Sequence, residues 1–296
     1  MRRRWRNIAV IVLALACTAA TIHLFSWPDI LRALADADYV VLLLGGGGLL
    51  LTGFAVRGLR WLLVVGIEPR PRKLLRSGLA NGAAAGFAIL TPFQLGEVLK
   101  VRLAPQHAEG GWRHGVSGFM VERVLDLSCL LGIGLSGLAI RAGHAWVAPL
   151  CWAMPLVSGL ALSLLADHVD RAPARARPYL ESFRHRRRIL LAGLATIPLW
   201  LLNAGMWWCA VASVGVRLDP MELCVVVGGV MLATVASMTP SGIGVSELST
   251  RGIMLWLGYP VAEAEATAIG LRLLSPLIAT LGLSCMLLMP LASRRD

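Results

Sequence analysis

The sequence predicts an all-α integral membrane protein built as an inverted repeat, in which each half has three full transmembrane helices and one broken re-entrant segment. Hydrophobic residues make up 57% of the 296 residues and the mean hydropathy is +0.70, which leaves too little polar surface for a soluble globule. Arg residues gather in the connections between the apolar runs, and one interrupted apolar motif occurs twice. These observations together predict the fold class.

The repeated motif is the sequence TPFQLGE at 91–97, inside the apolar stretch 81–100, and its order Thr-Pro, Gly, Glu returns in TPSGIGVSE at 239–247. The two Thr-Pro pairs lie 148 residues apart, which is half of the 296-residue length. A proline removes a backbone donor and a carboxylate at membrane depth is costly, so neither stretch is typical of a membrane helix. Broken segments at matching positions indicate an inverted repeat whose site lies where the breaks meet.

Full spans are expected where apolar runs reach roughly 20 residues, the length that crosses a bilayer. The run that begins near residue 8 follows several Arg residues and resembles a signal peptide, but it is long for one, so we interpret it as a first span. A short connection is expected at 28–38. We expect one transmembrane domain over 1–296, with halves of about 1–143 and 144–296, broken segments at 77–103 and 221–258, and full spans at about 8–25, 39–66, 116–140, 146–166, 189–214 and 266–288.

Charge predicts the orientation of the chain. The net charge of +11 comes from 28 Lys and Arg against 17 Asp and Glu, and positive connections are typical of cytoplasmic loops. If 77–103 crossed the membrane, the Arg-rich connection 167–188 would lie outside, whereas entry and return from the cytoplasm keeps it inside. The segment 221–258 then re-enters from outside, and both termini are cytoplasmic. Nucleic acid is not expected as a partner, because the Arg residues follow connections and not a groove-like face.

Charged side chains inside the spans indicate a candidate site. Arg57 lies roughly 15 Å from the end of its helix, where an unpartnered Arg costs about 3 kcal/mol or more. Its spacing places Arg57 on one helix face with Arg60 and Trp61. Snorkelling of both Arg side chains to the interface is the alternative.

The motif VERVLD at 121–126 groups Glu122, Arg123 and Asp126 on one helix face, where they can largely neutralise one another. Arg272 follows the second motif glutamate by 25 residues, as Arg123 follows the first by 26. Structural ion pairing is an equally good interpretation of the VERVLD charges, and pairing with an Arg or helix capping is the alternative for the two glutamates.

A helix that restarts after each break leaves unpaired amides at its positive N-terminus, and such an end attracts phosphate. With Arg residues nearby, the centre is expected to hold an anionic lipid headgroup, while the glutamates protonate, bind a cation or pair with a positive headgroup. No catalytic residue, metal site or cofactor is expected, because the His and Cys residues lack ligand spacing. The predicted binding and translocation residues are Arg57, Arg60, Trp61, Thr91, Pro92, Gln94, Gly96, Glu97, Lys100, Glu122, Arg123, Asp126, Thr239, Pro240, Gly242, Gly244, Glu247 and Arg272.

Five motifs in this order, RGLRW at 57–61, TPFQLGEVLK at 91–100, VERVLD at 121–126, TPSGIGVSE at 239–247 and LR at 271–272, give a chain that resembles the flippase-like lysylphosphatidylglycerol-synthase transmembrane family. The resemblance implies a lipid-translocating membrane domain, which in the multiple peptide resistance factors is fused to a soluble aminoacyl transferase. These 296 residues contain no segment that matches such a transferase. Stand-alone members resemble flippases for phospholipids or for lipid-linked and hopanoid-type molecules, and one archaeal relative is linked to sugar transfer from a polyprenyl lipid.

The chain departs from the family pattern at two positions. The family often places a basic residue between Pro and Gly-Glu, where this chain has Phe93-Gln94-Leu95, and another before the second Glu, where it has Ser246. The substrate charge of the aminoacylated-lipid members is therefore not carried over to this chain.

The leading hypothesis is a flippase of the bacterial inner membrane, not an enzyme, that moves a phospholipid or a polyprenyl- or hopanoid-linked headgroup through a central polar groove. Its partners are then membrane lipids with an anionic or lipid-linked headgroup. A membrane-embedded transferase with a polyprenyl-linked donor, and with Glu97 or Asp126 as general base, is the alternative. A non-catalytic partner of a lipid-biosynthesis enzyme is the third hypothesis.

Overall fold

The computed structural model describes residues 19–103, 111–169, 171–237 and 239–293. These residues form helices and contain no β-strand, which confirms the predicted all-α class. Among them, helices long and apolar enough to cross a membrane cover Val41–Val64, Trp112–Arg141, Ala145–Leu164, Arg186–Ser213, Pro220–Ser237 and Val261–Pro290.

The first half of the chain contains the two breaks in regular helix that matter most for its shape, a π-helical turn and a 3-10 helix. Its elements are α2 (Trp27–Ala35), the π-helical η1 (Val41–Gly46), α3 (Gly47–Val64), α4 (Pro71–Leu90), the 3-10 helix η2 (Pro92–Leu99), α5 (Lys100–Leu103) and α6 (Gly111–Arg141).

The second half has more numerous and mostly shorter elements. They are η3 (Ala145–Val147), α7 (Ala148–Trp152), α8 (Met154–Leu164), α9 (Ala166–Val169), η4 (Arg177–Tyr179), η5 (Glu181–Arg184), α10 (Arg186–Ser213), α11 (Pro220–Ser237), η6 (Pro240–Gly242), α12 (Val245–Leu257), α13 (Val261–Arg272) and α14 (Leu274–Ser293).

Two predicted segments differ from the structure. The connection expected at 28–38 is largely the helix α2, because Pro28 suits the first turn of a helix and Ile30 supplies a buried contact. The predicted last span is present within Val261–Pro290, but it is interrupted at Leu273, since α13 ends at Arg272 and α14 begins at Leu274. Of the predicted first span, residues 8–18 lie outside the described residues and 19–24 are helical.

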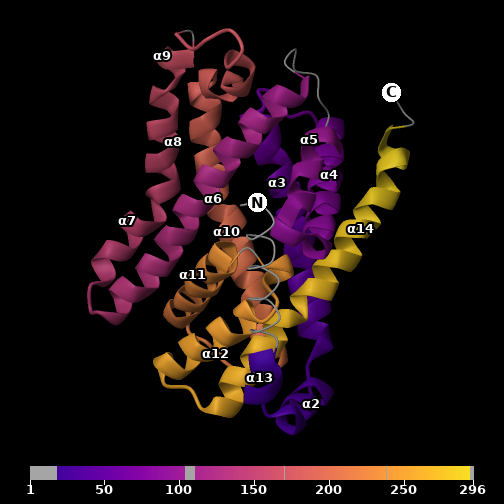
Figure 1. The fold of residues 1–296 in the computed structure, drawn as a ribbon, viewed down its shortest axis with the longest axis vertical. Coiled ribbons are helices and arrows are strands. Elements are labelled where there is room, and N and C mark those ends of the chain that lie inside the picture. Colours follow the sequence, from indigo (N-terminus) through magenta and orange to yellow (C-terminus); the bar gives the residue numbers. More distant parts are fainter. Residues whose placement is uncertain (1–18, 104–110, 170, 238, 294–296) are drawn as a thin grey trace, which may run out of the picture.

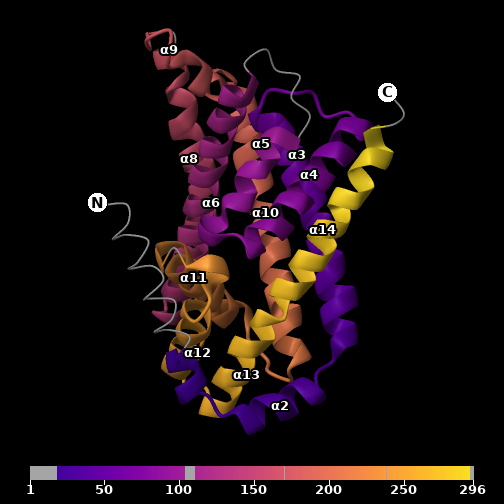
Figure 2. The same ribbon diagram turned by 45° about the vertical axis from the view of Figure 1, so that its right-hand side comes forward.

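The Arg-rich connection that begins near α9 lies at one end of the molecule (Figure 1). α5, α9 and the last turns of α14 are at this end, and α2 and the turn between α12 and α13 are at the other (Figures 1 and 2). The chain runs inward along α4 and returns to the same end with α5. This path agrees with the charge argument, while the re-entrant assignment, the inverted symmetry of the halves and the cytoplasmic position of this end remain predictions. The terminal Arg residues, at 2–6 and 294–295, lie outside the described residues.

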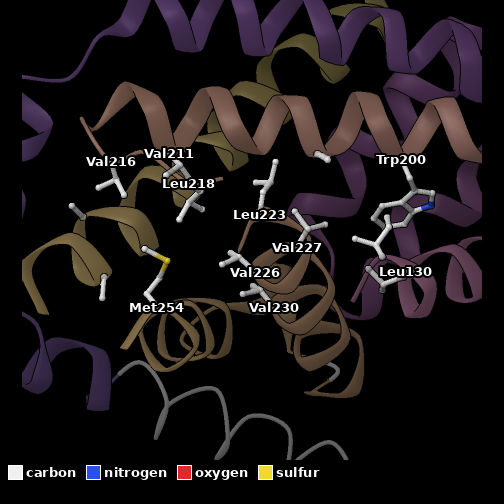
Figure 3. Close-up of a cluster of buried hydrophobic side chains, with 14 of the residues drawn as sticks. Leu130, Trp200, Val211, Val216, Leu218, Leu223, Val226, Val227, Val230 and Met254 are labelled. Atoms are coloured by element: carbon white, nitrogen blue, oxygen red, sulfur yellow. The ribbon is translucent and has the colours of Figure 1, made fainter. Parts of the chain in front are cut away.

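α10 passes through the middle of the molecule and forms one wall of the largest apolar core (Figure 3). Trp200 of this helix packs with Leu130 of α6 and with Val226 and Val230 of α11, and Met254 of α12 closes the cluster. Each of these side chains is less than a tenth exposed. The core therefore fixes α6, α11 and α12 relative to α10.

α4 packs backbone to backbone against two helices. A Cβ atom on Gly58 of α3 would lie 2.5 Å from the amide nitrogen of Gly78, and one on Gly282 of α14 would lie 2.5 Å from the carbonyl oxygen of Gly82. Only glycine permits such approaches. Because α4 is held on both sides, the break at its end has a fixed position.

Candidate functional site

The first break is closed by the side chain of Thr91. This residue is extended (φ −111°, ψ 141°), and its Oγ1 donates to the carbonyl of Phe87 (2.9 Å) and accepts from the amide of Gly96 (2.8 Å). A Cβ on Gly96 would lie 2.2 Å from the backbone nitrogen of Ala88, so glycine allows η2 to fold back on α4. The backbones of Pro92 and Gln94 lie in η2, and this turn directs Glu97 inward, where it is 6% exposed.

The predicted phosphate site at a helix N-terminus after the first break stays a prediction. Within the described residues the chain continues from the break as the 3-10 helix η2, and α5 begins at Lys100. The amide of Gly96 donates to Thr91 and is therefore not free for a ligand.

The second break is made by left-handed backbone. Ser241 (φ 50°), Gly242 (φ 66°) and Gly244 (φ 78°) turn the chain between α11 and α12, and the backbone of Pro240 lies in η6. The turn presents the carbonyl oxygen of Ser241 to Nη1 of Arg272, 3.1 Å away. Here an α-helix does restart, as predicted. The buried Thr239 lies at the entrance of the turn, where its hydroxyl lies 3.0 Å from that of Ser237.

The two breaks meet, as predicted, because η2 lies against η6. Asn203 of α10 lines one cavity together with Glu97 of the first break and Ser241 of the second, so the meeting point lies beside α10.

Seven charged side chains form one continuous network around the first break. Four are cations and three are carboxylates, so the network carries one net positive charge. Its members come from α3, η2, α5 and α6 and are Arg57, Arg60, Glu97, Lys100, Glu122, Arg123 and Asp126.

Arg60 is the buried centre of this network, with 1% of its surface exposed. Its Nη1 and Nη2 donate to the two carboxylate oxygens of Asp126 at 2.5 and 3.0 Å, and its Nε donates to Glu122 at 3.3 Å. Nη1 also donates to Thr196 of α10. This Arg does not snorkel to an interface, and its forked contacts give α3 a fixed rotation against α6.

Glu97 is the second centre, because three cations from three helices reach it. Nη1 of Arg57 lies 3.1 Å from Oε1, Nζ of Lys100 lies 3.2 Å from Oε2, and Nη2 of Arg123 lies 3.6 Å from Oε2. The side chains of Arg57 and Arg123 are 27% and 32% exposed, whereas that of Lys100 is 2% exposed. The two arginines are thus available to a ligand, and the lysine is not.

Lys100 joins the two centres. Its ammonium pairs with Glu122 as well as Glu97, and it lies 5.3 Å from the ring centres of both Trp61 and Phe119. Trp61, predicted as a site residue from its helix face, therefore lies beneath the lysine as a cation-binding surface. Of the VERVLD charges, Arg123 pairs with Asp126 (3.0 Å), but Glu122 pairs with Lys100 and Arg60 instead.

A separate cluster forms at the second break. Nε of Arg272 donates to Glu247 at 2.6 Å, and its Nη2 donates to the hydroxyl of Ser246 at 2.9 Å. Ser246 in turn donates to the other carboxylate oxygen of Glu247 (2.9 Å). Ser246 thus joins the arginine to the glutamate.

Two cavities lie between these clusters. The first has a volume of about 430 Å³ and reaches Arg123 and Asp126, and the second has a volume of about 190 Å³ and reaches Arg272. Both are lined by Arg57, Glu97, Asn203, Met231 and Thr234. The Arg57–Glu97 ion pair therefore belongs to the wall that the cavities share.

The structure brings Arg57, Glu97, Arg123 and Asp126 to the first cavity, but it does not place Arg123 and Arg272 in one cavity as a single headgroup site requires. Glu247 lines neither cavity and instead accepts a hydrogen bond from Arg272. Among the described residues, no group of three or more His, Cys, Asp or Glu side chains is arranged to hold a metal.

Sequence reasoning missed the polar face of α10. Trp200 donates from its indole nitrogen to Asp126 (3.2 Å), and Asn203 lines both cavities. With Thr196 these residues are spaced four and three apart, so they share one helix face. Two amide or hydroxyl side chains on one face of an otherwise apolar span were the signal that could have identified them.

The sequence from residue 7 to residue 282 matches the family model for the lysylphosphatidylglycerol synthase TM region. The chain belongs to this family. Neither a curated protein nor a solved structure matches it. Membership in the lysylphosphatidylglycerol synthase TM family, together with the apolar helices, identifies a multi-pass membrane protein related to lipid modification or lipid flipping.

Proposed function

We propose that this member of the lysylphosphatidylglycerol synthase TM family moves an anionic lipid headgroup, from a phospholipid or a polyprenyl- or hopanoid-type lipid, across the bacterial inner membrane. The observation that carries the proposal is the pair of cavities that share the Arg57–Glu97 wall and end at Arg123 and Arg272. The headgroup passes through the cavities while the tails stay in the bilayer. On this proposal the chain is a transporter and its termini are cytoplasmic.

Three arginines line the proposed path in order. Arg123 lines the first cavity, Arg57 lines both, and Arg272 lines the second. A guanidinium forms paired hydrogen bonds with phosphate oxygens and keeps its charge at any physiological pH. A phosphate can therefore exchange one arginine for the next without losing its counter-charge.

The charge arrangement around Glu97 makes the shared wall able to open. Removing one partner of a buried ion pair leaves an unpaired buried charge and costs about 3–5 kcal/mol of stability. When a phosphate binds Arg57, however, Glu97 remains paired with Lys100 and Arg123. An anion can thus displace the Arg57–Glu97 contact at a much smaller cost.

The same contacts favour transport over group transfer. A general base needs a free lone pair that faces the substrate. Asp126 accepts hydrogen bonds from Arg60, Arg123 and Trp200, and Glu97 is surrounded by three cations. Neither carboxylate is positioned as a free base, although both line a cavity.

Transport is tested in liposomes that contain the purified protein and a fluorescent phosphatidylglycerol or polyprenyl phosphate. We expect Arg57→Gln to slow the appearance of the lipid in the opposite leaflet at least about tenfold, since roughly 1.4 kcal/mol of anion contact is lost. Arg113→Gln is the matched control, because Arg113 is an exposed arginine of α6 that lines neither cavity.

Two results would contradict the proposal. One is that no lipid moves faster than in protein-free vesicles and that neither Arg57→Gln nor Glu97→Ala changes the rate. The other is a covalent lipid product, detected by mass spectrometry of the same vesicles supplied with a polyprenyl-linked donor, which would indicate a transferase.

A further inference from the structure

Outside the two central cavities, an apolar groove of about 280 Å³ lies between α6, α11 and α12. α11 contacts both of the other helices, and the three lie together in both views (Figures 1 and 2). Leu131, Leu135 and Leu138 of α6 line one side at a spacing of four and three residues. The groove therefore follows the helix axis for roughly 10 Å, at 1.5 Å per residue.

The floor of the groove is built from glycine. A Cβ on Gly228 would lie 2.4 Å from the Cα of Gly134, and a Cβ on Gly229 would lie 2.6 Å from Ile253. These glycines let α11 approach α6 and α12 closely, so the floor of the groove is low. Its rim is formed by leucines that are 42–47% exposed and by Trp256, which is 54% exposed.

A cation lies at one end of this groove. Arg141 is the last residue of α6, three residues beyond Leu138, and its guanidinium lies 4.5 Å from the ring centre of Trp256. Among the described residues no carboxylate pairs with it, in contrast to Arg57, Arg123 and Arg272. The helix dipole favours a cation at this terminus, and the guanidinium is still free to bind an anion.

We propose that this groove is a second lipid site, distinct from the transport path, which retains one glycerophospholipid with an acyl chain in the groove and its phosphate on Arg141. The lining is wholly apolar and runs parallel to the spans, as an acyl chain does. The single charge lies at the end of the groove, where a headgroup would be. The pattern of one apolar channel and one terminal cation matches a phospholipid, whereas a second protein helix would not require the cation.

The experiment uses the full chain in vesicles with a trace of phosphatidylglycerol that carries a photoreactive diazirine in one acyl chain. After illumination, labelled peptides are mapped by mass spectrometry. We expect labelling to concentrate on 131–138, 225–232 and 253–256, and Leu138→Trp, which fills the groove, to reduce it about tenfold. Leu287→Trp, on the exposed face of α14, is the matched control and should leave this labelling unchanged.

A second probe isolates the role of Arg141. Arg141→Gln should reduce labelling by the phospholipid about fivefold, and should leave labelling by a diazirine diacylglycerol, which has no phosphate, unchanged. Arg113→Gln is the control, since that guanidinium also lies over aromatic rings of Trp112 and Tyr179. Variants are compared only where their elution in size exclusion matches the parent.

Three outcomes overturn the proposal. The first is that the groove peptides are labelled no more than the exposed face of α14, which would mean that only bulk lipid is present. The second is that Leu138→Trp and Arg141→Gln are both labelled like the parent. The third is that cross-links join the groove to residues 1–18 or to a second copy of the chain, which would then be its occupant.

Discussion

The first break, at 91–97, holds its glutamate with cations from α3, α5 and α6, whereas the second, at 239–247, holds its glutamate with Arg272 and a serine. The motif order is the same in both. The difference lies in what surrounds the carboxylate. The first break belongs to a network of seven charges that ties three helices together, and the second is a local contact between α12 and α13.

The two breaks also differ in what determines their backbone conformation. The first has no residue with positive φ and needs Gly96 only for its close approach to α4. The second contains positive φ at Ser241, Gly242 and Gly244. Tertiary packing therefore shapes the first break, and local conformation shapes the second. From this difference we expect the first to be the more sensitive to loss of a single side chain.

The largest effect is expected from Arg60→Ala. It leaves the carboxylates of Glu122 and Asp126 buried with fewer partners, and removing one member of a buried ion pair costs about 3–5 kcal/mol. Arg272→Ala at the second break should cost less, about 1–2 kcal/mol, because Glu247 keeps Ser246 and the arginine is 25% exposed. Equilibrium unfolding in mixed micelles with increasing dodecyl sulfate measures both. Equal losses at the two sites would contradict the comparison.

The next largest difference in stability is expected between glycine substitutions at the two breaks. Gly96→Ala places a methyl group against the backbone of Ala88, which cannot rotate away, so we expect a loss of about 3 kcal/mol. Gly244→Ala imposes positive φ on a residue with a Cβ and should cost about 1–2 kcal/mol.

Both glycine variants are compared in the same unfolding assay, with Gly252→Ala as control, since a Cβ at Gly252 meets nothing within 4 Å. A larger loss from Gly244→Ala than from Gly96→Ala would show that packing does not govern the first break.

How far the sequence predicts this site depends on how many residues separate two interacting side chains in the chain. Spacing within one helix grouped Arg123 with Asp126, which form an ion pair, because a helix fixes which residues share a face. Hydropathy likewise predicted the spans within Val41–Val64, Trp112–Arg141, Ala145–Leu164 and Arg186–Ser213. The repeated motif predicted that the two breaks meet. Contacts such as Lys100 with Glu122 and Arg60 with Thr196, 22 and 136 residues apart, depend on how the helices rotate against one another. No local pattern specifies that rotation.

Local geometry was also harder to predict than the presence of a break. A proline followed by glycine indicates an interruption in either motif, but it does not distinguish the 3-10 helix η2 from the left-handed turn at η6. The close approach of Gly96 to Ala88 selects the first geometry, and this contact exists only once η2 has folded onto α4.

A smaller effect of opposite sign is expected at Ser241. Its φ of 50° and ψ of 18° place it in the left-handed region, which costs a residue with a Cβ about 1 kcal/mol relative to glycine. Ser241→Gly should therefore stabilise the protein by up to about 1 kcal/mol. The contact to Arg272 uses the serine carbonyl and is retained. Destabilisation by this variant would mean that the serine side chain, and not its backbone, supports the second break.

The smallest effect concerns pH and lies outside both breaks. His185 precedes α10 and packs against Gly66 after α3; burial, together with the positive charges of Arg188 and Arg184, lowers its pKa, while Glu181 opposes the shift. Because the pKa is lower in the folded state, the unfolded state binds the proton first as the pH falls through about 6.5. This contribution to stability is therefore present above that pH and is lost below it. Unfolding followed from pH 7.5 to 5 should show a shallower decline for His185→Gln than for the parent, while His144→Gln, an exposed histidine at the far end of α6, should follow the parent. An undiminished decline in His185→Gln would show that another group carries the pH dependence.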